Sequence, residues 1–288
     1  MRVSVIIPSR NEKYLNKTIS DVFNKAAGDV EVVAVIDGPT DHPLPIDRPG
    51  MTLVINPRPL GFRCAVNQAV AAASGEWLMK LDGHCMVSQD WDEVLKAECD
   101  MDWLMVGRRH ELDVENWSTQ NDTPVDYFYL SCPWTSPDGY MRDYRWVSRA
   151  QQRADVLVDE TMTISGSMWF MSKDHYINRI RTMYDEFGHF GEPQELCCKT
   201  WMSGGRVMVN KKMLHAHLRA PRKYSISWPT SRRMYQYVTQ YWSGDKWPYQ
   251  INNFGWIVDH FWPLPMAETR VRGEKYVWEQ DWRKYYHA

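Results

Sequence analysis

The residues with the clearest chemical potential are Asp82 and His84, which directly follow the apolar run Trp77–Leu81. Because side chains alternate along an extended backbone, two residues one position apart point the same way and can bind one divalent cation through oxygen and nitrogen. An Asp-x-His triplet is also typical of an ordinary turn after a strand, in which the Asp accepts backbone hydrogen bonds. The metal interpretation therefore depends on the rest of the chain.

The first hundred residues predict alternating strands and helices. Continuous apolar runs predict strands at 3–7, 30–36, 52–55 and 77–81, and helical spacing predicts helices near 13–26 and 62–73. Strands that are apolar on both faces and separated by helices indicate a mainly parallel sheet between two helical layers, an α/β/α sandwich. Residues 108–160 are expected to form loops over a site. Further along, we expect strands at 168–171 and 206–209 and helices at 173–182 and 193–202.

Polar residues follow three of these strands. In an open parallel sheet, ligands bind beyond the carboxyl ends of the strands, where the connections diverge. The residues concerned are Pro8, Arg10 and Glu12 after the first strand, Asp37 after the second, and Asp82 and His84 after the fourth. Asp37 can accept hydrogen bonds from a nucleobase imide or a ribose hydroxyl, and a cation at Asp82 and His84 can bridge a diphosphate. Because the sequence has no Gly-x-Gly-x-x-Gly and no Walker-type loop, the cation would have to bind the phosphates.

Three segments of the first half share their order and spacing with a known family. They read Val-Ser-Val-Ile-Ile-Pro-Ser-Arg-Asn-Glu at 3–12, Val-Ile-Asp-Gly-Pro-Thr-Asp at 35–41, and Gly61 through Asn67 to Leu-Asp-Gly-His at 81–84. They resemble the nucleotide-binding half of family-2-type glycosyltransferases, which have the GT-A fold. The Asp-x-His form and the segments at 161–173, 191–195 and 201–205 are similar to polypeptide N-acetylgalactosaminyltransferases in particular. The resemblance covers residues 1–220.

This resemblance implies a metal-dependent transfer of a sugar from a UDP-sugar to an acceptor hydroxyl. It implies that Mn²⁺ or Mg²⁺ is held by Asp82, His84 and a third ligand from Leu-His-Ala-His-Leu-Arg at 214–219. His217 matches that third ligand better than His215, although strand alternation puts both on one face. The residues that the resemblance places around the donor nucleotide are Pro8, Arg10, Glu12, Asp37, Arg63, Asn67, Arg219, Arg222 and Lys223.

The sequence departs from the family pattern near the acceptor. Inverting members of the superfamily use a Glu-Asp pair to supply the general base, and here the pair reads Glu192-Pro193. Because proline has no basic group, either Glu192 or Glu195 is the base, or the reaction proceeds without one and retains the anomeric configuration, as in polypeptide N-acetylgalactosaminyltransferases. Carboxylates near a helix N-terminus are also favoured by the helix dipole alone. His189 stands where that family has a Trp beside the donor sugar, so the resemblance does not identify the sugar.

Basic and aromatic residues concentrate in the last quarter of the chain. Residues 219–288 hold 11 Lys and Arg against 6 Asp and Glu. We therefore expect a catalytic domain at 1–218, with a nucleotide-binding half at 1–107 and an acceptor half at 108–218, followed by a basic aromatic extension at 219–288. Such a surface suits nucleic acid, and we favour a hydroxymethylated base in DNA as the acceptor, as in some bacteriophage enzymes, over protein Ser/Thr or a glycan. The alternative is a helical tail that packs its rings on the main domain.

The remaining features limit the class of protein. No segment has the length and apolar character of a membrane span, and the first apolar run is too short for a signal peptide, so we expect a cytoplasmic protein, in the host cytoplasm if it comes from a phage. The six cysteines show no Cys-x-x-Cys spacing and are expected to be reduced. Two other functions stay open. One is a nucleotidyltransferase that forms a sugar nucleotide, and the other is a non-catalytic module that binds nucleotide sugars.

Overall fold

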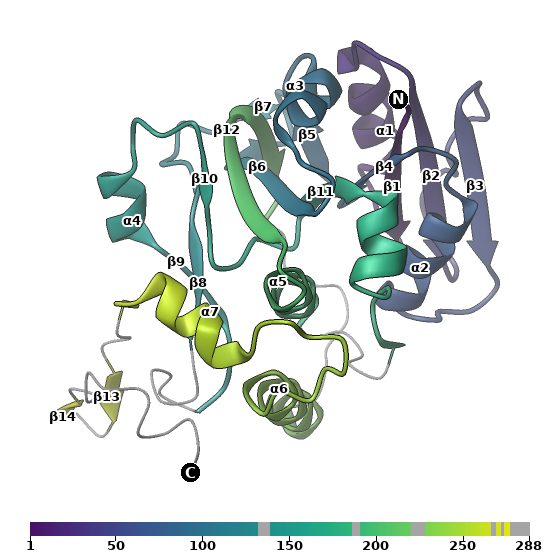
Figure 1. Cartoon of the computed structure of the whole chain (residues 1–288). Helices are drawn as coiled ribbons and strands as arrows, with labels where there is room; N and C mark the ends of the chain where they lie inside the picture. Colours follow the sequence, from purple (N-terminus) through teal and green to yellow (C-terminus); the bar gives the residue numbers. More distant parts are fainter. Residues whose placement is uncertain (132–138, 186–190, 220–227, 266–268, 272–273, 277–288) are drawn as a thin grey trace.

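The structure is a computed structural model that describes residues 1–131, 139–185, 191–219, 228–265, 269–271 and 274–276. Its centre is a ten-stranded mixed sheet with the order β10-β12-β6-β11-β4-β1-β2-β3, in which β5 also pairs with β12 and β7 with β6 (Figure 1). These strands are β1 (Val3–Ser9), β2 (Val30–Asp37), β3 (Met51–Asn56), β4 (Trp77–Leu81), β5 (Cys85–Val87), β6 (Trp103–Asp113), β7 (Ser118–Thr119), β10 (Val158–Glu160), β11 (Met168–Ser172) and β12 (Arg206–His217).

Two small hairpins and eight helices complete the described elements. The hairpins join β8 (Phe128–Leu130) to β9 (Asp143–Arg145) and β13 (Thr269–Val271) to β14 (Glu274–Tyr276). The helices are α1 (Leu15–Lys25), α2 (Phe62–Ala72), α3 (Trp91–Glu98), α4 (Val147–Gln152), the π-helix η1 (His175–Arg179), α5 (Glu192–Met202), α6 (Trp228–Ser243) and α7 (Phe254–Phe261).

The first half of the chain forms the parallel part of the sheet. β1 pairs with β2 on one side and with β4 on the other, both in parallel. The connection β1-α1-β2 and the connection β3-α2-β4 cross the sheet in opposite directions, so right-handed crossovers place α1 and α2 on opposite faces (Figure 1). The sandwich predicted from the apolar runs is confirmed. The strand order reverses between β1 and β4, which is the place where open sheets of this kind bind ligands.

The second half of the chain makes the sheet mixed. β11 lies antiparallel between β4 and β6, and β12 runs parallel to β6. The strand predicted at 206–209 continues to His217, because β12 passes a bulge between Asn210 and Leu214 and then pairs with both β6 and β5. The helix predicted at 173–182 is only the five-residue π-helix η1. Residues 108–160 contain the end of β6 and several short elements, where loops were expected.

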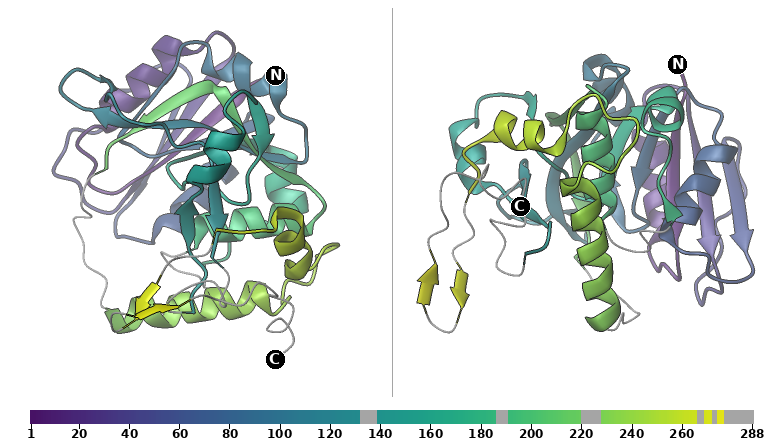
Figure 2. Two further views of the ribbon diagram at one scale, coloured as in Figure 1. Left: turned by 90° about the vertical axis from the view of Figure 1, so that its left-hand side faces the viewer. Right: turned by 60° about the horizontal axis from the view of Figure 1, so that its bottom comes forward.

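The described part of the C-terminal extension packs on the rest of the molecule. Trp242, Trp247 and Phe254 are buried in the same hydrophobic core as the sheet. The ring of Phe261 lies 5.2 Å from that of Trp201 in α5, at an angle of 75°. Figure 2 shows α6 running along one edge of the molecule. None of the described helices has both the length and the apolar character that crossing a bilayer requires, and the five cysteines within the described ranges are free thiols.

Candidate active site

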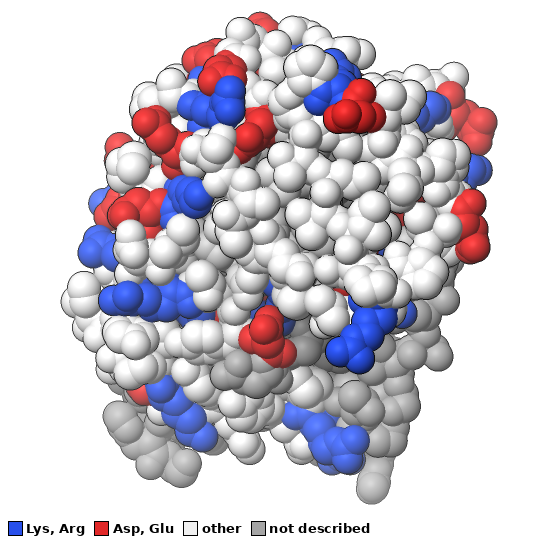
Figure 3. Space-filling view, turned by 90° about the vertical axis from the view of Figure 1, so that its right-hand side faces the viewer, with Lys and Arg blue, Asp and Glu red and all other residues white. Residues whose placement is uncertain are grey.

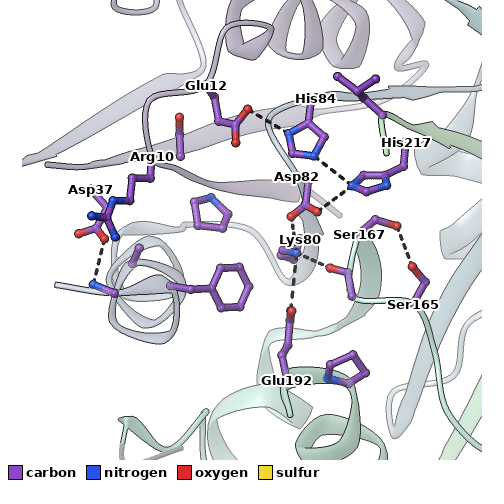
Figure 4. A pocket seen from close by; sticks show the side chains of 18 of the residues that line it. Arg10, Glu12, Asp37, Lys80, Asp82, His84, Ser165, Ser167, Glu192 and His217 are labelled. Atoms are coloured by element: carbon purple, nitrogen blue, oxygen red, sulfur yellow. Dashed lines mark hydrogen bonds and ion pairs between the residues drawn. The ribbon is translucent and has the colours of Figure 1, made fainter. Parts of the chain in front are cut away.

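A cavity of about 620 Å³ opens where the strand order reverses, beyond the carboxyl ends of β1, β2 and β4 (Figure 4). It is closed on the other side by the N-terminal ends of α2 and α5. The residues of its lining that the sequence singled out are Pro8, Arg10, Glu12, Asp37, Asp82, His84, Glu192 and His217. The cavity is also lined by polar and aromatic residues that were not predicted from the sequence, among them Lys80, Asp143, Ser165, Ser167, Gln194 and Tyr235.

Asp82, His84 and His217 form a cluster that can hold a cation. One ligand atom from each residue lies within 4.8 Å of the others. The Nε2 atoms of the two histidines are 3.0 Å apart, and Nε2 of His217 is 3.3 Å from Oδ2 of Asp82 (Figure 4). The pairing of β5 with β12 explains this approach, because it places His217 opposite Cys85, the residue after His84. Two imidazole nitrogens and a carboxylate oxygen are a donor set that suits Mn²⁺ and related divalent ions.

The structure distinguishes between the two histidines of β12. His215 is completely buried, and its Nε2 lies 3.0 Å from the hydroxyl of Ser167. Burial, together with the charges of His217 and Arg109, lowers the pKa of His215 to about 3, so this imidazole stays neutral. His217, two residues later, is the one whose side chain reaches Asp82 and His84.

His84 is oriented by a carboxylate behind it. Its Nδ1 lies 3.0 Å from Oε2 of Glu12, which leaves Nε2 directed at the cluster. Burial alone would lower the pKa of His84, but the hydrogen bond with Glu12 and the charge of Asp82 outweigh it and raise the pKa. Burial lowers the pKa of His217, with a further contribution from His84. Both rings must present an unprotonated nitrogen to hold a cation, so protons and cations compete for this cluster.

A buried lysine stands beside the cluster. Lys80 is 1% exposed, and its Nζ lies 2.6 Å from Oδ1 of Asp82 and 3.7 Å from Oε1 of Glu192. It also donates a hydrogen bond to the carbonyl of Gly166. Burial alone would raise the pKa of Asp82, but Lys80 and the hydrogen bond from His217 hold it well below its usual range, so Asp82 is ionised. A single lysine inside the otherwise apolar strand β4 is the signal that could have identified it from the sequence.

Asp37 lies at the other end of the cavity. It is only 3% exposed, and its carboxylate accepts hydrogen bonds from the backbone N–H of Leu60 at 2.7 Å and of Gly61 at 2.9 Å. Gly61 has φ 105°, a left-handed conformation that lets the chain turn over Asp37 before α2 begins. Arg10 is exposed and lines the same part of the cavity. Asp37 therefore fixes the loop before α2 and keeps further lone pairs directed at the cavity.

Three predicted site residues lie below the cavity and do not line it. Glu195 is completely buried and forms ion pairs with Arg63 and with Lys199, the latter at 2.6 Å. Asn67 donates to the carbonyl of Met183 at 3.0 Å. These contacts hold α2, α5 and the segment between η1 and α5 together. Of the two glutamates that were candidates for the base, only Glu192 faces the cavity.

The remaining predicted residues follow β12 or precede α5. Arg219 is exposed and does not belong to the lining of the cavity. Arg222, Lys223 and His189 lie outside the described residues.

Comparisons with known proteins agree on one family. The sequence model of a family described as Glycosyl transferase family 2 matches residues 4–180. A curated protein of Macaca fascicularis, named inactive polypeptide N-acetylgalactosaminyltransferase-like protein 5, is 27% identical over 225 residues, which cover 72% of this chain and 49% of that protein. The chain thus spans about half the length of this relative.

Two solved structures show how the fold compares. A crystal structure of GalNAc-T7 with UDP, GalNAc and Mn²⁺ has a TM-score of 0.63 at 18% identity, covering 83% of this chain and 48% of that one. A crystal structure of S. aureus TarS 1-349 in complex with UDP-GlcNAc has a TM-score of 0.50 at 13% identity, covering 83% of this chain and 65% of that one. The likeness to GalNAc-T7 shows a GT-A fold, as the resemblance in the sequence implied.

Proposed function

The chain belongs to glycosyl transferase family 2, and we propose that it transfers a sugar from a UDP-sugar to an acceptor hydroxyl with the help of a divalent cation. The observation that carries the proposal is the cluster of Asp82, His84 and His217 at the point where the strand order reverses, in one cavity with Asp37. One of the two similar structures was solved with UDP, GalNAc and Mn²⁺, and the other in complex with UDP-GlcNAc. A nucleoside diphosphate would extend from Asp37 and Arg10 to this cluster.

The residues of the cluster fit Mn²⁺ or Mg²⁺, with Mn²⁺ favoured by the two imidazoles. Such a cation stabilises the negative charge that develops on the departing phosphate. Glu12 directs Nε2 of His84 toward the other two residues of the cluster, which would hold the cation with it, and Lys80 keeps Asp82 ionised while occupying only its Oδ1. Two of the three ligand side chains, Asp82 and His84, are thus oriented by neighbouring residues before the cation binds.

The sugar would lie beyond the diphosphate, against the wall formed by α5 and the segment before β11. Glu192 is held there by the indole N–H of Trp169 at 2.9 Å and by the ion pair with Lys80. Ser165 and Ser167, whose hydroxyls are 3.1 Å apart, face the same space (Figure 4). Carboxylate and hydroxyl groups in this arrangement can accept from and donate to sugar hydroxyls.

For the acceptor, we propose a hydroxymethylated base in DNA, because basic and aromatic side chains lie beside the cavity. Tyr235 of α6 lines the cavity, and the guanidinium of Arg142 lies 4.3 Å from its ring centre. Nε of Arg232 donates to the hydroxyl of Tyr140 at 3.0 Å. On the face seen in Figure 3, basic side chains are spread from top to bottom, whereas most acidic ones lie in the upper half. Basic and aromatic groups side by side suit a nucleic acid.

One experiment tests donor and acceptor together. The protein is incubated with Mn²⁺ and a panel of UDP-sugars, with hydroxymethylated duplex DNA, plain DNA, a Ser/Thr-rich peptide or an oligosaccharide as the acceptor, and the products are identified by mass. We expect the mass of one sugar to be added to hydroxymethylated DNA only. Addition to the peptide or the oligosaccharide instead would overturn the DNA acceptor and leave the sugar transfer standing.

The same mixtures distinguish the other functional classes. Release of pyrophosphate from a nucleoside triphosphate and a sugar phosphate would identify a nucleotidyltransferase. Binding of a UDP-sugar without any cleavage would identify a non-catalytic module, a necessary control because the macaque relative is named inactive. Cleavage of the donor in the presence of Mn²⁺ would exclude both.

A further inference from the structure

The proposed transfer leaves one step to be assigned, the removal of the proton from the acceptor hydroxyl. Glu195 cannot do this, because it is sealed in the core between Arg63 and Lys199. Pro193 has no basic group, and Glu192 faces the cavity as a counterion of Lys80. A group that the family motifs do not point to must therefore be sought in the lining of the cavity.

Asp143 of β9 is such a group. It lines the same cavity as Glu192, and its carboxylate accepts hydrogen bonds from the hydroxyl of Thr163 at 2.9 Å and from the side-chain amide of Gln194. Gln194 directly follows Pro193, so Asp143 lies against the helix start at which inverting relatives carry their base. The family motif places that base on α5, whereas here a carboxylate from β9 accepts a hydrogen bond from a side chain at the start of α5.

The carboxylate of Asp143 has hydrogen-bond donors around it but forms no ion pair with a cation in the described part of the chain. Where α5 and β9 line the cavity, the described carboxyl groups are those of Glu192 and Asp143. Of these two, only Glu192 forms an ion pair with a described cation. Burial raises the pKa of Asp143 to about 7, and the charge of Glu192 adds to the effect, although the hydrogen bonds from Thr163 and Gln194 oppose it. The other titratable groups nearby are the thiol of Cys197 in α5 and the phenol of Tyr235 in α6. A carboxyl group that ionises near neutral pH matches the requirement for a general base.

We propose that Asp143 is the catalytic base that takes the proton of the acceptor hydroxyl, an inference that rests on the proposed function. The acceptor oxygen forms a bond to the anomeric carbon while the bond from that carbon to the phosphate oxygen breaks. The electron pair of the broken bond leaves with the nucleoside diphosphate. The hydroxyl proton passes to the carboxylate of Asp143 and from there to water. A direct displacement of this kind inverts the anomeric carbon, whereas the family resemblance implies retention.

The test uses the full chain and its Asp143→Asn variant, which keeps the shape of the side chain and removes the basic oxygen. UDP-glucose or UDP-GlcNAc is supplied with Mn²⁺ and hydroxymethylated DNA. We expect the variant to lose about 10²- to 10⁴-fold in the rate of transfer, the usual contribution of a general base. Its Mn²⁺-dependent binding of UDP, measured by calorimetry, should be unchanged. Formate, a small carboxylate, should restore part of the rate, and the transferred sugar should be the β-anomer by NMR.

Three results would overturn the assignment. One is a variant that transfers the sugar within a few-fold of the wild-type rate, and another is an α-linked product. The third is a variant whose rate falls together with its UDP affinity and does not respond to formate, because a merely structural role predicts that pattern. If the wild-type chain binds no UDP with Mn²⁺ and cleaves neither donor, the proposed function fails and the assignment fails with it. If wild type and variant transfer equally well, only the role of Asp143 fails.

Discussion

Replacing Glu195 by Gln tests whether its carboxylate has a structural or a catalytic role. Glu195 and Lys199 are completely buried and Arg63 is 2% exposed, so this carboxylate is the counterion of two cations that have no access to water. Breaking a buried pair by removing one partner costs about 3–5 kcal/mol, because a charge is left uncompensated. The backbone N–H of Tyr184, which donates to Glu195 at 2.8 Å, can still bond to the amide oxygen of Gln.

The matched control is Glu192→Gln. Lys80 keeps Asp82 and the carbonyl of Gly166 as partners in that variant. Burial also raises the pKa of Glu192, so the charge that the substitution removes is already disfavoured in the folded state. We therefore expect a much smaller loss of stability for Glu192→Gln than for Glu195→Gln. For a chain of this size, about 1 kcal/mol shifts the midpoint of thermal unfolding by about 2–4 °C. Glu195→Gln should thus lower the Tm by about 6–20 °C.

The assay is thermal unfolding followed by circular dichroism, together with calorimetric titration of UDP in the presence of Mn²⁺ at a temperature at which both variants are folded. Glu195→Gln should unfold early and, where it is folded, bind UDP like the wild type. A Glu195→Gln variant with the Tm of the wild type and a complete loss of transfer would refute this reasoning and return Glu195 to the role of base.

Three further outcomes are expected. Asp82→Ala and His84→Ala should each abolish transfer; His84→Ala should change the Tm little, whereas Asp82→Ala should also lower it, because the buried Lys80 loses its nearest counterion; normal turnover by a folded double variant would contradict the metal site. Relative to the wild type, Asp143→Asn should gain stability as the pH rises from about 4 to above 7, because the raised pKa of about 7 makes the ionised Asp costly in the folded state; a stability difference between variant and wild type that does not change over this pH range would count against this pKa. Trp242→Ala should cost about 3–5 kcal/mol, since its fully buried ring fixes α6 to the core; an unchanged urea unfolding curve would show that α6 is energetically independent.

The fold of the first half follows from the sequence because its strands are buried on both faces. A strand without a polar face reads as a continuous apolar run, and β1, β2 and β4 were predicted to within two residues of their ends. β6 was missed and β12 was predicted too short, because both continue beyond their apolar residues into segments such as Arg108–His110 and Lys211–Lys212. Pairing with β12, which a local pattern does not contain, keeps Arg108–His110 extended, and β12 resumes its pairing with β6 at Leu214, after the bulge that holds Lys211 and Lys212.

The candidate site could be predicted where it depends on the ends of strands. Asp37 is the last residue of β2, Asp82 and His84 come just after β4, and the topology alone brings them to one edge. The choice between His215 and His217 depended on the register of β12 against β5. Asp143 was not predicted because it lies in a polar, aromatic stretch without periodicity, and only its contact with α5 places it in the cavity.

The most direct test of the proposed metal site is the binding of UDP with and without Mn²⁺. It is measured by calorimetry on the wild-type chain and on the His217→Ala and His215→Ala variants. We expect Mn²⁺ to tighten the binding of UDP to the wild type, and we expect His217→Ala to remove this dependence because it takes away one of the three ligand atoms. His215→Ala should keep the dependence, since His215 faces Ser167 and not the cluster. The proposed metal site would be contradicted if the UDP affinity of the wild type did not change with Mn²⁺. It would also be contradicted if His217→Ala kept the Mn²⁺ dependence of the wild type.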